Sequence, residues 1–164
     1  MNPKPTISIP KFLEGDLGRT YSGPAWYILK KLDTQVDLIL DPKRFFREVN
    51  AHRSLEILTY TYSYAPTTLV RRLVLGKPFV LNPSLLPNPD NVRRHDSLHT
   101  KLFLGYGRTC NLTDAYIGSQ NCTAPTTYNV MFHINNRKTL SVLREYFDHI
   151  WNEATPYKEC KTKR

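Results

Sequence analysis

The stretch from Leu98 to Asn121 reads LHTKLFLGYGRTCNLTDAYIGSQN and is the most informative part of the chain. His99-Thr100-Lys101 opens one apolar run, and Gly118-Ser119-Gln120-Asn121 closes the next. Because side chains alternate along a strand, His99 and Lys101 are predicted to share one face. The turn after the second run adds a hydroxyl, an amide and exposed backbone N–H groups. These groups can attack a phosphodiester and bind its oxygens, so the stretch indicates phosphoryl chemistry.

Apolar periodicity in the rest of the chain alternates between the two regular structures. Strands are predicted over residues 36–40, 55–62, 79–81, 98–104, 114–117 and 129–134. Helices are predicted to start at residues 22–24, at Asp41-Pro42 and at Pro66, the last of these ending at Gly76, and a further helix spans 137–151. Residues 82–97 are predicted to be a loop. The pattern favours one α/β domain with a largely parallel or mixed β-sheet flanked by helices.

Domain organisation and compartment follow from composition. We expect an N-terminal arm over residues 1–20, the domain over 21–156 and a basic C-terminal tail over 157–164. No apolar run approaches ~18 residues, so no membrane span or membrane partner is expected. The start of the chain lacks the apolar core of a signal peptide, which favours a cytoplasmic protein. The three cysteines, Cys110, Cys122 and Cys160, lack metal-ligand spacing and are expected to be reduced.

The charge balance favours a polyanionic partner. The chain has a net charge of +9 and a pI near 9.6. Nucleic acid is the commonest such partner, and DNA is expected ahead of RNA. Arg93 and Arg94 lie just before the His99 strand and are candidate substrate-binding residues that could clamp phosphates, although a solvated face is the alternative.

The order of motifs resembles a known family. A strand with His99-x-Lys101, a strand ending in Gly118-Ser119-x-Asn121, a further strand and an amphipathic helix ending in Phe147-Asp148-x-x-Trp151 are similar to the phospholipase D superfamily. The closest likeness is to its small nucleases, which carry one motif per chain. The resemblance covers roughly residues 35–155.

The resemblance implies a mechanism and a half-domain that dimerises. Two motifs make one site in this family, so a chain with a single motif forms a homodimer. His99 of one subunit attacks phosphorus, and His99 of the other protonates the leaving oxygen and then activates water. Lys101 and Asn121 hold the non-bridging oxygens, and Ser119 supports them. No metal and no cofactor is required by this chemistry.

Two departures from the family pattern concern carboxylates. Tyr106 stands where the family commonly has an aspartate, and Tyr128 or Asn129 stands where it has a carboxylate that orients a histidine. Asp114 and Asp96 are the candidate substitutes. The loop before the Gly-Ser turn is also longer than in compact members.

The alternatives stay open on the sequence alone. The leading interpretation is a metal-independent nuclease. The second is a nucleic-acid-binding or inhibitory protein that keeps the fold without turnover, and the third is a phospholipid-hydrolysing enzyme, which the charge disfavours. Tyr60, Tyr62 and Tyr64 are expected to pack in or beside the sheet. The alternative is that one of them stacks on a nucleic-acid base. Four further histidines are interpreted as surface or satisfied side chains: His52, His95, His133 and His149.

Overall fold

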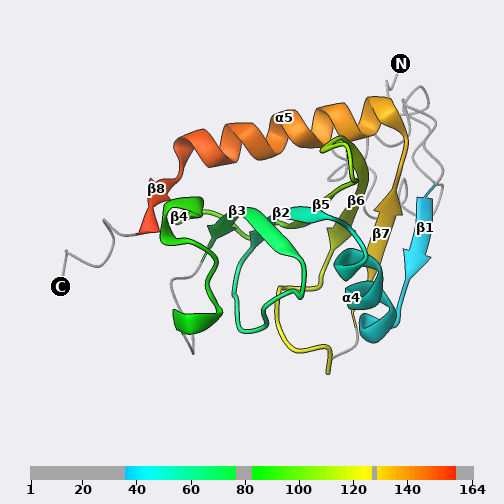
Figure 1. Ribbon diagram of the computed structural model, residues 1–164, viewed down its shortest axis with the longest axis horizontal. Coiled ribbons are helices and arrows are strands. Elements are labelled where there is room, and N and C mark those ends of the chain that lie inside the picture. The colour runs from blue at the N-terminus through cyan, green and yellow to red at the C-terminus, as the bar shows by residue number, and fades with distance from the viewer. Residues whose placement is uncertain (1–35, 77–82, 127–128, 158–164) are drawn as a thin grey trace, which may run out of the picture.

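The computed structural model describes residues 36–76, 83–126 and 129–157, which form one twisted sheet with a helix on each side (Figure 1). The elements are β1 (Val36–Ile39), α4 (Pro42–Asn50), β2 (Ser54–Thr59), β3 (Leu69–Leu75), two short 3₁₀ turns (Pro83–Leu85 and Pro89–Asn91), β4 (Val92–Arg94), β5 (Lys101–Tyr106), β6 (Leu112–Gly118), β7 (Met131–Ile134), α5 (Arg137–Glu153) and β8 (Thr155–Pro156). The expected arm at 1–20, the expected helix starting at 22–24, the expected strand at 79–81 and most of the basic tail lie outside the described residues.

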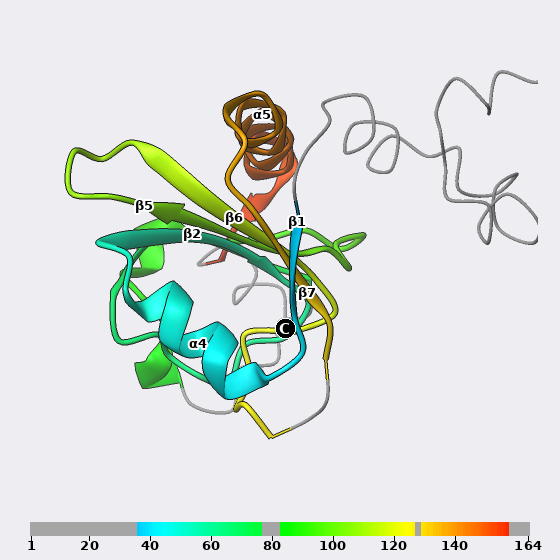
Figure 2. The same ribbon diagram turned by 90° about the vertical axis from the view of Figure 1, so that its right-hand side faces the viewer.

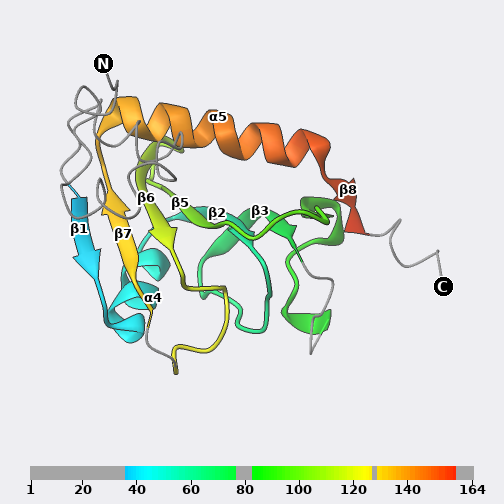
Figure 3. The ribbon, with the colours of Figure 1, turned by 180° about the vertical axis from the view of Figure 1, so that it is seen from behind.

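The sheet is mixed, as predicted. Its eight described strands run in the order β1-β7-β6-β5-β2-β3-β4-β8, from β1 at one edge to β8 at the other (Figure 3). Only β2-β3 and β3-β4 are parallel pairs, and the other described pairs are antiparallel. Because β5 runs against β2, the start of β5 lies beside the carboxyl ends of the parallel strands, with Leu102 opposite Leu58. This end of the sheet is where the sequence motifs meet.

The two helices cover opposite faces of the sheet (Figure 2). Asp41 caps α4 by accepting a hydrogen bond from the Lys43 amide at 2.9 Å, and Pro42 occupies the first helical position. Helix α4 buries Phe45, Phe46 and Val49, and the Phe45 ring meets Phe103 of β5 edge-on at 5.0 Å. Replacing such a buried phenylalanine by alanine costs about 3–5 kcal/mol.

Helix α5 covers the other face of the sheet. Leu140, Phe147 and Ile150 are buried against Leu102, Leu104 and Ala115 of the sheet, in a core separate from that under α4. Asn136 caps the helix by accepting from the amides of Lys138 and Thr139. No helix among the described residues is long and apolar enough to cross a membrane.

The helix predicted between Pro66 and Gly76 is wrong: residues 69–75 form strand β3. The apolar positions of Leu-Val-Arg-Arg-Leu-Val-Leu recur at a spacing that also suits a helix. Strand pairing makes this segment a strand, because β3 pairs with β2 along the whole length of β2 and with β4 on its other side. A helix would leave the backbone groups of β2 without partners on that edge.

Two further predictions need correction at this end of the sheet. The expected loop at 82–97 contains β4, so Arg93 and Arg94 lie on a strand rather than on a loop. The strand expected from Leu98 begins only at Lys101, which leaves His99 just before β5. The amide of His95 donates to the Leu75 carbonyl, so this segment crosses the end of β3 before entering β5.

Candidate active site

The fold brings the predicted site residues to one end of the sheet. Lys101, the first residue of β5, pairs with Gly118, the last residue of β6, so Ser119 follows directly beside the start of β5. The segment after β6 then turns towards β2, where Asn121 accepts a hydrogen bond from the Tyr60 amide at 3.1 Å. His99, Lys101, Ser119 and Asn121 therefore lie around the carboxyl end of β2.

His99 and Lys101 are in direct contact. The Lys101 ammonium lies 3.0 Å from Nδ1 and 3.3 Å from Nε2 of the His99 imidazole, and it donates to the His99 carbonyl at 2.6 Å. The sequence predicted that the two side chains share one face of a strand. His99 instead precedes the strand, and the Lys101 side chain reaches back to contact it. The imidazole is exposed, so it can meet a substrate.

The Lys101 ammonium is a buried charge that lacks a carboxylate. The whole residue has 7% exposure, and no described residue forms an ion pair with its ammonium. Burial lowers the pKa of Lys101 because removal from water penalises the charged form. A buried ammonium in this state is stabilised by an anion. The geometry thus provides a positive centre beside an exposed imidazole.

Tyr60 is a site residue whose contact with His99 the sequence did not reveal. Its ring lies 5.0 Å from the His99 ring, and the Lys101 ammonium lies 5.8 Å from the Tyr60 ring centroid. Gly76 leaves room for this ring, because a Cβ there would come within 2.8 Å of Tyr60 Cδ2. Tyr60 follows β2, and only the strand order brings it beside residue 99.

The side chains of Asn121 and Ser119 form hydrogen bonds to neighbouring residues of the protein. Asn121 Oδ1 accepts from the Tyr60 amide at 3.1 Å and from the Thr59 hydroxyl at 3.3 Å. Its side-chain NH2 donates to no described residue, so both N–H groups remain for a ligand. Ser119 Oγ donates to Asn129 Oδ1 at 3.0 Å and accepts from the Val130 amide at 2.9 Å. Ser119 therefore anchors the turn onto the start of β7.

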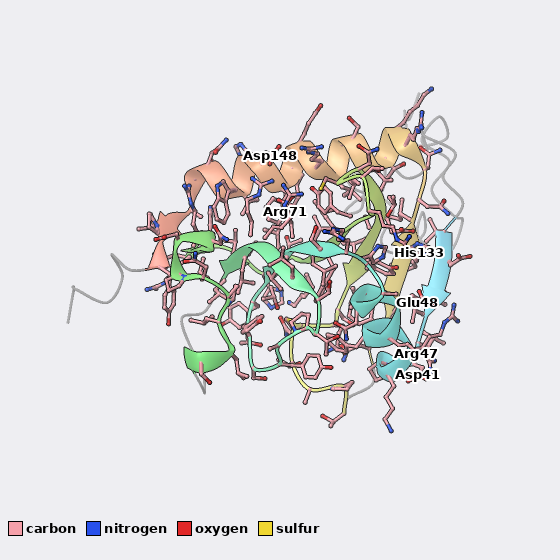
Figure 4. The ribbon with its side chains drawn as sticks, viewed as in Figure 1. Asp41, Arg47, Glu48, Arg71, His133 and Asp148 are labelled. Carbon is pink, nitrogen blue, oxygen red and sulfur yellow. The ribbon has the colours of Figure 1, made fainter. Side chains whose placement is uncertain are left out.

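The candidate substitute carboxylates do not reach His99. Asp114 pairs with Gly105 in the β5-β6 ladder, about 13 Å along the strand from the Lys101 pair. The Asp114 carboxylate accepts a hydrogen bond from His133 Nε2 at 2.6 Å. Figure 4 labels His133, which lies on the side of the sheet that α4 covers. Asp96 instead forms an ion pair with Arg94 at 2.7 Å. The described residues that contact the His99 ring are Lys101 and Tyr60.

The positions that depart from the family pattern have structural roles. Tyr106 has 1% exposure and lies under the Arg71 guanidinium, 4.9 Å from its ring centroid. Burial, together with the neighbouring Glu56 carboxylate, raises the pKa of Tyr106. Asn129 holds Ser119 and donates to Gln120 Oε1 at 2.7 Å. Tyr128 lies outside the described residues.

Arg93 and Arg94, the predicted phosphate clamp, already have partners. The Arg93 guanidinium donates to the Trp151 carbonyl at 2.8 Å and lies 4.3 Å over the Trp151 ring, which fixes it against α5. Arg94 pairs with Asp96, whose side chain is 81% exposed. Such a surface pair is weak, about 0–1 kcal/mol, so Arg94 is the one of the two that a phosphate can recruit.

The other described histidines are engaged elsewhere. His95 Nε2 lies 3.3 Å from Glu153, and its Nδ1 accepts from the Ser97 amide at 3.2 Å. His149 also faces Glu153, at 3.3 Å. His52 and His133 flank Asp114 at the far end of β6. These placements agree with the interpretation of these four as satisfied side chains, and they leave His99 as the exposed imidazole of the site.

The fold has relatives among solved structures. No protein-family model and no curated protein matches the sequence. NucT from Helicobacter pylori superposes with a TM-score of 0.55 at 11% identity, covering 75% of this chain and 99% of its own. Nuc from Salmonella typhimurium, a phospholipase D family member, superposes with a TM-score of 0.53 at 13% identity, covering 74% of this chain and 96% of its own. The chain has the phospholipase D fold. The resemblance predicted from the motifs is thereby confirmed at the level of the fold.

Proposed function

We propose that this protein is a phosphodiesterase that cleaves nucleic acid through a phosphohistidine intermediate. The observation that carries the proposal is the buried Lys101 ammonium against the exposed His99 imidazole. An ammonium without a carboxylate favours an anion at this point, and an imidazole beside it can act as nucleophile. The fold shared with NucT and with Nuc, a phospholipase D family member, supports the same reaction class.

The reaction divides into two displacements at phosphorus. In the first, the His99 ring nitrogen forms a bond to phosphorus while the bond to the leaving oxygen breaks, and that oxygen takes a proton from a second imidazole. In the second, this now neutral imidazole removes a proton from water, and the resulting hydroxide displaces His99 from phosphorus. Lys101 and the free NH2 of Asn121 hold the non-bridging oxygens throughout.

The second imidazole comes from another copy of the chain in this proposal. The other histidines among the described residues contact carboxylates or lie at the opposite end of the sheet. A two-fold contact places identical residues on both sides of its axis, so His99 of the partner subunit would face the same phosphate. A homodimer with one shared site then accounts for the single motif per chain.

A metal-free assay tests the proposed reaction. Labelled single- and double-stranded DNA and RNA would each be incubated with the protein in EDTA, with DNA expected as the better substrate. Cleavage should persist in EDTA, vanish in His99→Ala and survive in His149→Ala, a matched change of an exposed histidine on α5. Cleavage that requires added magnesium, or that survives His99→Ala, would disprove the phosphohistidine mechanism.

A binding protein without turnover is the second candidate. One observation favours it: no described carboxylate orients the His99 imidazole, and the Lys101 ammonium contacts both of its ring nitrogens. This candidate predicts nucleic-acid affinity that His99→Ala leaves unchanged, with no product from any of the labelled substrates.

A further inference from the structure

A cavity of about 310 Å³ opens at the far end of the sheet from His99. It is lined by residues of the turn between α4 and β2 and of the hairpin between β5 and β6, namely Ala51, His52, Arg53, Gly107 and Arg108. The two segments are held together, because the Arg53 amide donates to the Tyr106 carbonyl at 2.9 Å and Ser54 pairs with Tyr106. The cavity is therefore built on ladder hydrogen bonds.

The cavity carries two guanidinium groups with free donors. Arg53 and Arg108 are exposed, and neither guanidinium forms a hydrogen bond or an ion pair with a described residue. Arg72, by contrast, is bound by Glu56 and Asp148. A guanidinium presents a planar fork of donors that matches the oxygens of a phosphate. Two such forks beside one cavity favour an anionic ligand.

The His52 imidazole is held at the wall of this cavity. Its ring lies flat against Gly105, where a Cβ would approach ring atoms to 2.7 Å. Nε2 is 3.0 Å from the Tyr116 hydroxyl and 3.7 Å from Asp114 Oδ2, whereas Nδ1 has no partner among the described residues. Burial lowers the pKa of His52, although the Asp114 carboxylate opposes this effect, so the neutral ring is favoured. With its proton on Nδ1, the neutral ring can accept from the Tyr116 hydroxyl at Nε2 and donate to a ligand at Nδ1.

The neighbouring carboxylates do not oppose an anion strongly. Asp114 is bound by His133 at 2.6 Å, and Glu48 of α4, labelled in Figure 4, is paired with Arg44 at 2.8 Å. Each of these negative charges is compensated by a partner outside the cavity. Arg53 and Arg108 therefore keep a net positive field over the opening.

We propose that the His52–Arg53–Arg108 cavity binds a backbone phosphate of the nucleic acid, as a second contact remote from the catalytic phosphate. This inference rests on the proposed function, because it takes the same polyanion as ligand. The six residues of β5 separate the two sites by about 17 Å, which corresponds to roughly five base-pair steps of B-form duplex. A substrate must be longer than that to reach both.

The test measures binding without cleavage. A His99→Ala parent, which cannot turn over, is titrated with a labelled 20-base-pair DNA duplex at several salt concentrations. Arg53→Ala/Arg108→Ala is added to this parent, and Arg137→Ala/Lys138→Ala is the control, since it removes equal charge from exposed positions on α5. Thermal unfolding of each variant verifies the fold.

The cavity variant should bind about tenfold more weakly than the parent, and its salt slope should fall by about two, one for each lost phosphate contact. The control should change affinity less than threefold, and a single-stranded trinucleotide, too short to reach both sites, should lose less affinity in the cavity variant than the 20-base-pair duplex does. Equal losses in both double variants would overturn the second contact while leaving catalysis by His99 untouched. A parent that binds no nucleic acid at all would instead overturn the proposed substrate class, and the cavity assignment with it.

Inorganic phosphate is the second probe, and it distinguishes a site for free phosphate from a site for the backbone phosphates of a nucleic acid. Nuclear magnetic resonance of the histidine ring protons reports its binding at His52. Duplex DNA should shift the His52 signals in the parent but not in the cavity variant. Signals that respond to inorganic phosphate and not to the duplex would overturn the assignment to a polymer backbone.

Discussion

The Tyr60 ring packs against the His99 imidazole, with centroids 5.0 Å apart and planes inclined by 46°. The Tyr60 amide is in turn bound by Asn121 Oδ1 at 3.1 Å, so one residue connects two members of the candidate site. No described carboxylate touches His99, which leaves this ring and the Lys101 ammonium to set the orientation of the imidazole. Tyr60 therefore lies where a residue that orients the His99 imidazole would lie.

Replacing Tyr60 by leucine should reduce kcat by about 10²-fold with little change in KM, because a displaced nucleophile loses its alignment with phosphorus. Tyr60→Phe keeps the ring and should restore most of the rate. Steady-state kinetics on a labelled oligonucleotide distinguish the two. A loss of similar size in both variants would show that the hydroxyl rather than the ring matters. A rise in KM alone would indicate base stacking.

Lys101 should show opposite effects on activity and on stability. Lys101→Met removes the charge that we propose stabilises the transition state, so the rate should fall by at least 10²- to 10³-fold. Because the ammonium is buried without a carboxylate, the same change should raise the free energy of unfolding by ~1 kcal/mol. Denaturant titration measures the second effect. A destabilised Lys101→Met protein would mean that the contacts with His99 outweigh the cost of burying the charge.

The sequence predicted the elements whose signals are local. Asp41-Pro42 marks the start of α4 by itself, and the spacing of Leu140, Phe147 and Ile150 defines the buried face of α5. Residues 69–75 have a spacing that fits both regular structures, and only pairing with β2 and β4 makes them a strand. Short apolar runs of this kind are decided by tertiary context.

The same distinction applies to the site. His99, Lys101, Ser119 and Asn121 are recognisable as a motif, and the fold places them together, while their catalytic roles stay predictions. The contact of Tyr60 with His99 and the commitment of Arg93 to Trp151 depend on strand order, which residue spacing does not encode. Asp114 looked available to His99 in the linear chain, but the β5-β6 register places it at the other end of the ladder.

The His133–Asp114 pair should make stability depend on pH. The hydrogen bond that His133 donates to the Asp114 carboxylate raises the pKa of His133, although burial opposes this effect. Because the pKa of His133 is higher in the folded protein, the pair contributes its full stabilisation below the unfolded-state pKa of about 6.5. This contribution is lost as pH rises through the folded-state pKa of His133. Burial alone would raise the pKa of Asp114, but the bond from His133 lowers it, so acid protonation also removes the contribution.

His133→Gln isolates this effect from that of His52, whose pKa is lowered by burial. The difference in unfolding free energy between the wild-type protein and His133→Gln should be largest near pH 5–6 and should shrink towards pH 9. Urea titrations at each pH give this difference. A difference that grows with pH would show that His133 is held neutral in the folded protein.

Mixing subunits tests whether two copies of His99 share one phosphate. If each site needs both imidazoles, a heterodimer of wild-type and His99→Ala chains has one nucleophile and no acid, so it should be nearly inactive. After exchange, activity should fall with the square of the wild-type fraction. His149→Ala chains serve as the dilution control, since their heterodimers keep both copies of His99 and should hold activity constant. A linear fall with His99→Ala, or a monomer in light scattering that still cleaves, would place the second acid within the chain. His95 would then be the first candidate, because its segment leads directly into β5.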